Sequence, residues 1–153
     1  MRFISHRGNL NGKDIKNENK PKIVDHAINL GFECEIDIWY TDGKLFLGHD
    51  FPQIYIEDNY IFDRVNHLWI HCKNIQALTW CKSIKNKKLN FFWHESDLVT
   101  LTSLGNIWAF PGKQPIENSI AVMPEIHDDQ NLEKCFGICS DVIIDYKKLY
   151  EKV

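Results

Sequence analysis

The alternation of strand-like and helix-like segments constrains the fold of this chain more than any other feature. A short apolar run at residues 3–5 is followed by apolar residues at helical spacing from Ile23 to Leu30, and then by strict alternation over residues 33–39. Strands that alternate with helices predict an α/β fold with a largely parallel sheet, either open or closed into a barrel. Further segments follow the same pattern, with strand candidates at residues 68–72, 89–93, 107–110, 119–123 and 136–139 and helix candidates at residues 75–84 and 97–104.

The bulk properties fit one ordinary globular domain. The chain has 153 residues, which predicts a single domain over residues 1–153, and its net charge of -3 argues against a dedicated nucleic-acid-binding protein. The N-terminus lacks a charged-then-apolar signal segment, and no run approaches the roughly 18 apolar residues of a membrane span. The five cysteines are odd in number and irregularly spaced, which favours reduced thiols. We therefore expect a cytoplasmic protein without a membrane span.

Two carboxylates share one face of the predicted strand at residues 33–39. Glu35 and Asp37 are two residues apart, so both side chains project from the same side of an extended strand. Like charges held there repel each other, and burying them requires a cation or strong hydrogen-bond donors. Carboxylate oxygens suit Mg²⁺ or Ca²⁺. The alternative interpretation is an exposed strand face with solvated carboxylates.

Two histidines stand at the C-terminal ends of candidate strands, which is the edge where active sites gather in parallel α/β folds. Imidazole titrates near neutral pH, so His6 and His49 could act as general base and general acid at a phosphorus centre. Arg7 can bind a phosphate through two parallel hydrogen bonds, and Lys73 could add a second positive charge. A structural histidine and a surface cation are the alternative interpretations.

Other polar residues lie at or just beyond strand ends and could face the same site. They are His71, His94, Glu95 and Glu125. For residues 94–97 the favoured interpretation is a helix start, with Ser96 as the N-cap of the helix expected at residues 97–104.

A set of short motifs in a fixed order adds to this interpretation. They are His6-Arg7-Gly8, Glu18-Asn19, Glu35-x-Asp37, Thr41-Asp42-Gly43, His49-Asp50, Ile70-His71-Cys72-Lys73 and Gly137-Ile138-Cys139-Ser140-Asp141. In order and approximate spacing they resemble the glycerophosphodiester phosphodiesterase family, within the wider group of phospholipase-C-like barrels. The specific part of the resemblance covers residues 3–50.

The resemblance implies a (β/α) barrel of the TIM type, with its site at the C-terminal ends of the strands. Because such barrels usually need about 250 residues, we expect a compact, truncated barrel with shortened helices. The resemblance also implies roles for individual residues: His6 and His49 as the acid–base pair, Arg7 and Lys73 as the phosphate contacts, and Glu35 and Asp37 as ligands of a divalent metal, Mg²⁺ or Ca²⁺.

The residue two positions before Lys73 departs from the family pattern. The family places a third acidic metal ligand there, whereas this chain has His71. Imidazole is a poorer ligand for Ca²⁺ or Mg²⁺ than a carboxylate and shifts the preference toward Mn²⁺ or Zn²⁺. Three interpretations follow: His71 is a ligand of a different metal such as Mn²⁺, Glu95 or Glu125 supplies the missing oxygen, or the metal site has decayed.

These residues predict a hydrolase, a metal-dependent phosphodiesterase that cleaves a small glycerophosphodiester-like substrate by His/His acid–base catalysis. In the mechanism implied by the resemblance, a neighbouring substrate hydroxyl attacks phosphorus and gives a cyclic phosphate that water then opens. The alternatives are a lyase that releases the cyclic phosphate and a non-catalytic phosphate- or partner-binding module on a degenerate barrel. The expected partner is a small-molecule phosphodiester, and a truncated barrel could also cover exposed sheet by forming a homo-oligomer.

Overall fold

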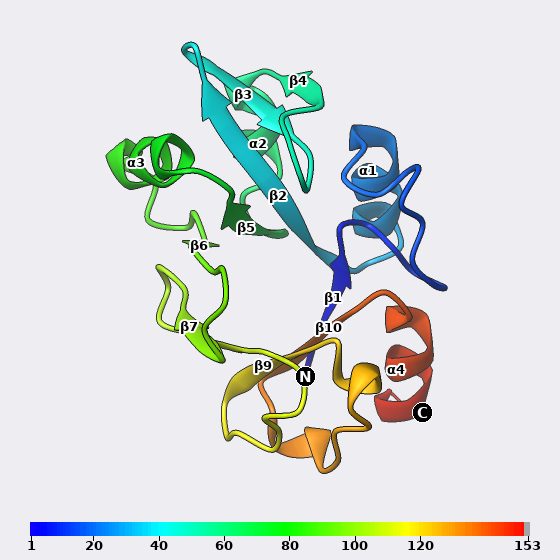
Figure 1. Cartoon of the computed structure of the whole chain (residues 1–153). Coiled ribbons are helices and arrows are strands. Elements are labelled where there is room, and N and C mark those ends of the chain that lie inside the picture. The colour runs from blue at the N-terminus through cyan, green and yellow to red at the C-terminus, as the bar shows by residue number, and fades with distance from the viewer. Residues whose placement is uncertain (152–153) are drawn as a thin grey trace.

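A single mixed sheet of ten strands curves into a half-barrel and carries short helices on its outer face (Figure 1). The computed structural model describes residues 1–151. The strands are β1 (Arg2–His6), β2 (Glu33–Thr41), β3 (Lys44–Leu47), β4 (Ile54–Ile56), β5 (Leu68–Cys72), β6 (Phe91–Phe92), β7 (Val99–Leu101), β8 (Ile107–Ala109), β9 (Ser119–Val122) and β10 (Gly137–Ser140). The helices are α1 (Pro21–Asn29), α2 (Asp58–Asp63), α3 (Ile75–Ser83) and α4 (Ile143–Tyr150), with short 3₁₀ turns η1 (Pro124–Ile126) and η2 (Leu132–Lys134).

Most of the sheet is parallel, and antiparallel pairing is confined to β7 and to the β3–β4 extension beside β2. Strands β8, β9, β10, β1, β2, β5 and β6 follow one another as parallel neighbours. Strand β2 also continues into the antiparallel strands β3 and β4, and β7 pairs antiparallel with β8. The parallel order places the C-terminal ends of β1, β2 and β5 side by side.

The two ends of the curved sheet, β6 and β7, are bridged by single hydrogen bonds instead of a strand ladder. The Ser103 amide donates to the Phe91 carbonyl at 2.8 Å, and the Ser103 hydroxyl donates to the Leu89 carbonyl at 2.9 Å. The Thr100 hydroxyl donates to the Trp93 carbonyl, also at 2.9 Å. These contacts join the β6 end of the curved sheet to the β7 end, although β6 and β7 do not pair as strands.

The expectation of a truncated TIM-type (β/α) barrel with shortened helices is therefore wrong. The described residues form four α-helices of only six to nine residues, and about a quarter of the chain is helical. The helix expected at residues 97–104 is also wrong, because residues 99–101 form β7. Val99 and Thr100 are β-branched and favour extended backbone. With no helix between β6 and β9, that part of the sheet lacks the helical cover that defines a TIM barrel.

Three helices pack on the strands that carry the polar residues. Helix α1 begins with Pro21, buries Val24 and Ala27, and packs on β2. Helix α3 is capped by Asn74, whose side-chain oxygen accepts from the Ala77 amide at 2.9 Å. The Asn74 amide also donates to the Tyr40 carbonyl, which ties the start of α3 to β2. Helix α4 packs on β1 and β10.

Aromatic side chains fill the interior of the half-barrel. Trp108 packs between Trp69 and Phe92, with ring centroids 5.6 and 4.6 Å apart respectively, and all three rings are buried. A separate apolar cluster lies between β2 and the outer helices and includes Ile36 and Ile38. The polar mouth of the half-barrel therefore rests on a packed core. Among residues 1–151, no helix combines the length and the apolar character needed to cross a membrane.

Candidate functional site

Polar side chains converge at the C-terminal ends of β1, β2 and β5. In the sheet register His6 lies opposite Glu35, and Asp37 lies opposite His71. Every residue predicted for the site except Asp37 lines one pocket of about 260 Å³: His6, Arg7, Glu35, His49, His71 and Lys73. The parallel register thus brings together residues that are more than sixty positions apart in the chain.

Glu35 and Asp37 on β2 are both buried, which rules out a solvated strand face for this pair. Glu35 is 2% exposed and Asp37 is fully buried, while the alternate residues Ile36 and Ile38 pack into the apolar cluster under the helices. Burial, together with the charge of Asp37, raises the pKa of Glu35. Burial alone would raise the pKa of Asp37 as well, but the neighbouring His71 and Arg7 hold it well below its usual range. The basic neighbours therefore favour the ionised form of Asp37, whereas burial and the charge of Asp37 disfavour the ionised form of Glu35.

Arg7 is the main basic partner of the carboxylates. Its Nε lies 2.8 Å from Asp37 Oδ2, and its NH1 donates to Glu18 Oε1 at 3.0 Å. The backbone of Arg7 has a φ of 55°, a left-handed conformation that is uncommon outside glycine. Its amide donates to both the carbonyl and the carboxylate of Glu35, so this unusual backbone is tied directly to β2. Arg7 is consequently fixed in place before any ligand arrives.

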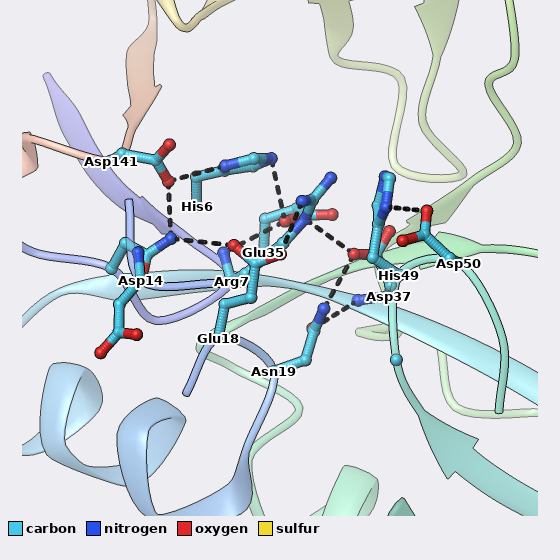
Figure 2. Close-up of polar contacts among 12 residues, drawn as sticks. His6, Arg7, Asp14, Glu18, Asn19, Glu35, Asp37, His49, Asp50 and Asp141 are labelled. Carbon is cyan, nitrogen blue, oxygen red and sulfur yellow. Dashed lines mark hydrogen bonds and ion pairs between the residues drawn. The ribbon is translucent and has the colours of Figure 1, made fainter. Parts of the chain in front are cut away.

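Asn19 also holds Asp37, at the same carboxylate oxygen that Arg7 contacts (Figure 2). Its side-chain amide donates to Asp37 Oδ2 at 2.9 Å, and its side-chain oxygen accepts from the Asp37 amide at the same distance. Asn19 is buried and also has a left-handed backbone, with a φ of 62°. Asparagine tolerates this conformation better than other non-glycine residues, which explains its place in the Glu18-Asn19 motif.

His6 is supported by a carboxylate that directly follows the last strand, β10. Its Nδ1 lies 2.8 Å from Asp141 Oδ1, and its Nε2 faces the pocket, 3.9 Å from Glu35 Oε2. Burial alone would lower the pKa of His6, but the hydrogen bond to Asp141 and the charge of Glu35 outweigh burial and raise it. The Asp141 carboxylate also accepts from Asn9 at 2.8 Å, and contact with His6 lowers its pKa although burial opposes this.

His49 has the opposite electrostatic environment. It follows Gly48 after β3, its Nδ1 lies 2.7 Å from Asp50 Oδ1, and it is the more exposed of the two histidines. Burial and the positive charge of Arg7 lower its pKa. Figure 2 shows the rings of His6 and His49 on opposite sides of the Glu35 side chain in that view. The pocket therefore holds one imidazole that favours the protonated form and one that favours the neutral form.

The remaining predicted residues fall into two groups. Lys73 lines the pocket and its Nζ lies 3.6 Å from Asp37 Oδ1, and Glu95 is an exposed residue of the pocket wall. Glu125 is turned away, because it accepts hydrogen bonds from Ser140 and Tyr146. Residues 94–97 do not start a helix but form a loop, whose His94 carbonyl contacts the site.

Sequence reasoning misses two residues that organise the site. Asp141 supports His6, and Asn9 joins Asp141 to Glu18, its amide lying 2.8 and 3.4 Å from the two carboxylates. The signals were present, since Asn9 directly follows the first motif and Asp141 ends the last one. Their roles depend on β1 and β10 being neighbours, which is a property of the sheet order.

The residues present fit a divalent cation. One ligand atom from each of Glu35, Asp37 and His71 lies within 4.8 Å of the others. Asp37 Oδ1 is buried and has no hydrogen-bond partner, so an oxygen suited to a metal is left unsatisfied. Two carboxylates and one imidazole could therefore hold an ion at the base of the pocket.

Comparisons of the chain with protein-family models, with curated proteins and with solved structures find no match.

Proposed function

We propose that this protein is a metal-dependent phosphodiesterase that cleaves a small phosphodiester, of the glycerophosphodiester class, in the pocket between His6 and His49. The observation that carries the proposal is the opposite electrostatic environment of these two histidines in a pocket that also holds Arg7 and Lys73. Pairs of titratable groups whose pKa values are pushed apart are typical of acid–base catalysis. The motif resemblance gives the proposal its substrate class.

The basic side chains would bind and orient the phosphate. Arg7 and Lys73 place two positive charges against the carboxylates and toward the pocket, where they can contact the non-bridging oxygens of a phosphodiester. Arg7 is held by Glu18 and Asp37, so little conformational entropy would be lost when substrate binds. A divalent metal held by Glu35, Asp37 and His71 would supply Lewis-acid polarisation of a phosphoryl oxygen.

The two histidines would move the protons. Neutral His49 takes the proton of the attacking hydroxyl, which is a substrate hydroxyl next to the phosphate. The new oxygen–phosphorus bond forms as the bond to the leaving alcohol breaks, and protonated His6 gives that alcohol its proton through Nε2. Asp141 holds Nδ1–H of His6, which keeps Nε2–H directed at the pocket. Water then opens the cyclic phosphate with the two histidines in exchanged roles.

Phosphorus NMR of the products tests the reaction class. Glycerophosphodiesters incubated with the metal-loaded protein should give a glycerol phosphate and a free alcohol, and EDTA should stop the reaction until metal is restored. Accumulation of a cyclic phosphate as the final product would change the assignment to a lyase. Stoichiometric binding of glycerol phosphate without turnover under any metal would support a non-catalytic binding module and contradict the proposal.

A further inference from the structure

The ring of His71 has a defined orientation and a defined protonated nitrogen. It stacks on Phe92 with centroids 5.0 Å apart and an interplanar angle of 11°. Its Nε2 lies 2.9 Å from the carbonyl oxygen of His94. A carbonyl oxygen only accepts hydrogen bonds, so Nε2 must carry a proton and donate it. The other nitrogen, Nδ1, then points at the carboxylates of β2.

The two carboxylates near Nδ1 favour a cation at this position. Nδ1 lies 3.0 Å from Asp37 Oδ1 and 3.8 Å from Glu35 Oε1. In a neutral ring with Nε2 protonated, Nδ1 presents a lone pair, and a lone pair facing two carboxylates is repulsive. Either a second proton on the ring or a metal ion between the three groups removes the repulsion. Lys73 does not take this place, since its Nζ is 3.6 Å from Asp37 Oδ1 and makes no hydrogen bond to it.

Neither of the other acidic residues predicted for the site completes the cluster. Glu125 is engaged by Ser140 and Tyr146, and Glu95 is exposed on the pocket wall and does not belong to the group of ligand atoms within 4.8 Å. The third ligand available beside the two carboxylates is therefore a nitrogen. A histidine whose second nitrogen donates to a backbone carbonyl has the arrangement usual for metal-ligating histidines.

We propose that His71 Nδ1 is a direct metal ligand and that it makes the site selective for a divalent first-row transition-metal ion such as Mn²⁺ over Ca²⁺ and Mg²⁺. This inference deepens the proposed function, since it concerns the cofactor of the same pocket. Ca²⁺ and Mg²⁺ are hard ions that take oxygen ligands, whereas Mn²⁺ and Zn²⁺ accept imidazole together with carboxylates. The ring needs no reorientation to bind, because Phe92 and the His94 carbonyl already fix it.

Metal binding by the stripped protein tests the proposal independently of catalysis. The electron paramagnetic resonance signal of unbound Mn²⁺, followed during a titration, gives the dissociation constant of the Mn²⁺–protein complex. Competition with Ca²⁺ gives the selectivity between the two ions. We expect Mn²⁺ to bind at least about tenfold more tightly than Ca²⁺, and pulsed resonance to detect a ¹⁴N coupling from the imidazole. His71→Glu should remove the coupling and shift the selectivity toward Ca²⁺ by about tenfold or more. The exposed His26 on α1 supplies the matched control, His26→Gln, which should change neither.

The outcomes separate this inference from the proposed function. Three results would overturn it: absence of the ¹⁴N coupling in the wild-type protein, tighter binding of Ca²⁺ than of Mn²⁺, or no metal binding at all. Nitrogen-coupled Mn²⁺ without phosphodiester cleavage would support it and overturn only the proposed function. If His71→Glu does not fold by circular dichroism, His71→Gln serves instead, and loss of the coupling with retained fold supports the proposal.

Discussion

Replacing Asn19 tests how much the two hydrogen bonds between its side chain and Asp37, called the Asn19 clamp below, contribute to stability. Asn19→Ala removes one hydrogen bond to a carboxylate, worth about 1.5–3 kcal/mol, and leaves the buried Asp37 amide without an acceptor, which costs about 1–3 kcal/mol. It also puts alanine at a φ of 62°, which adds about 1 kcal/mol. The sum predicts a loss of about 4 kcal/mol or more, a large part of the 5–15 kcal/mol typical of whole domains.

Two further variants divide this loss into its parts. Asn19→Gly loses the same hydrogen bonds but relieves the backbone, so it should be about 1 kcal/mol more stable than Asn19→Ala. The nearby Asn17→Ala removes only exposed side-chain contacts to Asp14 and Lys20 and should cost less than about 1 kcal/mol. Urea unfolding followed by tryptophan fluorescence gives the three free energies of unfolding. A loss below about 1 kcal/mol for Asn19→Ala would refute the reasoning, because the Asn19 clamp would then contribute no more than a surface contact.

Three other predictions follow from the same geometry. Gly48→Ala places a methyl carbon 2.3 Å from the Phe51 carbonyl oxygen, at a φ of 149°. The substitution should therefore displace His49 and lower kcat, with little change in the unfolding midpoint. An unchanged kcat would contradict this. Asp141→Asn removes the negative charge beside His6, so the pKa of His6 should fall. The limb of the kcat/KM profile that needs protonated His6 should then move to lower pH. An unmoved limb would show that Asp141 does not support His6. All five thiols are buried, and burial raises the pKa of Cys34 to about 12. The native protein should therefore react slowly with Ellman's reagent, and the unfolded protein should react rapidly. Fast reaction before unfolding would contradict the burial of the thiols.

Local patterns in the sequence predict the local parts of this site well. The alternation over residues 33–39 places Glu35 and Asp37 on one face and the apolar residues on the other, and the strands at β1, β2 and β5 form where expected. His71 lies beside Asp37 because β5 pairs with β2 in this register, a long-range contact that local patterns alone do not determine. Polar residues at the ends of strands can thus be predicted from the sequence where the strands themselves are clearly predicted.

The features that the sequence does not predict depend on long-range contacts. Thr100 and Val99 lie in a segment with mixed helical and extended preferences, and pairing with β8 decides for the strand. The TIM-type expectation relies on helices that the short connections after β6 cannot provide. Asp141 becomes a partner of His6 only because β10 lies next to β1, and no spacing rule in the sequence indicates that contact.

The most direct test of the central claim compares glycerophosphodiester cleavage by the Mn²⁺-loaded wild-type protein with cleavage by His6→Asn and His49→Asn. Asparagine is close to histidine in size and cannot transfer protons at neutral pH, so the comparison isolates acid–base catalysis. The account predicts turnover by the wild-type protein and a loss of about 10²–10⁴-fold in kcat for each variant, with the fold retained. Wild-type rates in either variant, or no turnover by the folded, metal-loaded wild-type protein, would contradict it.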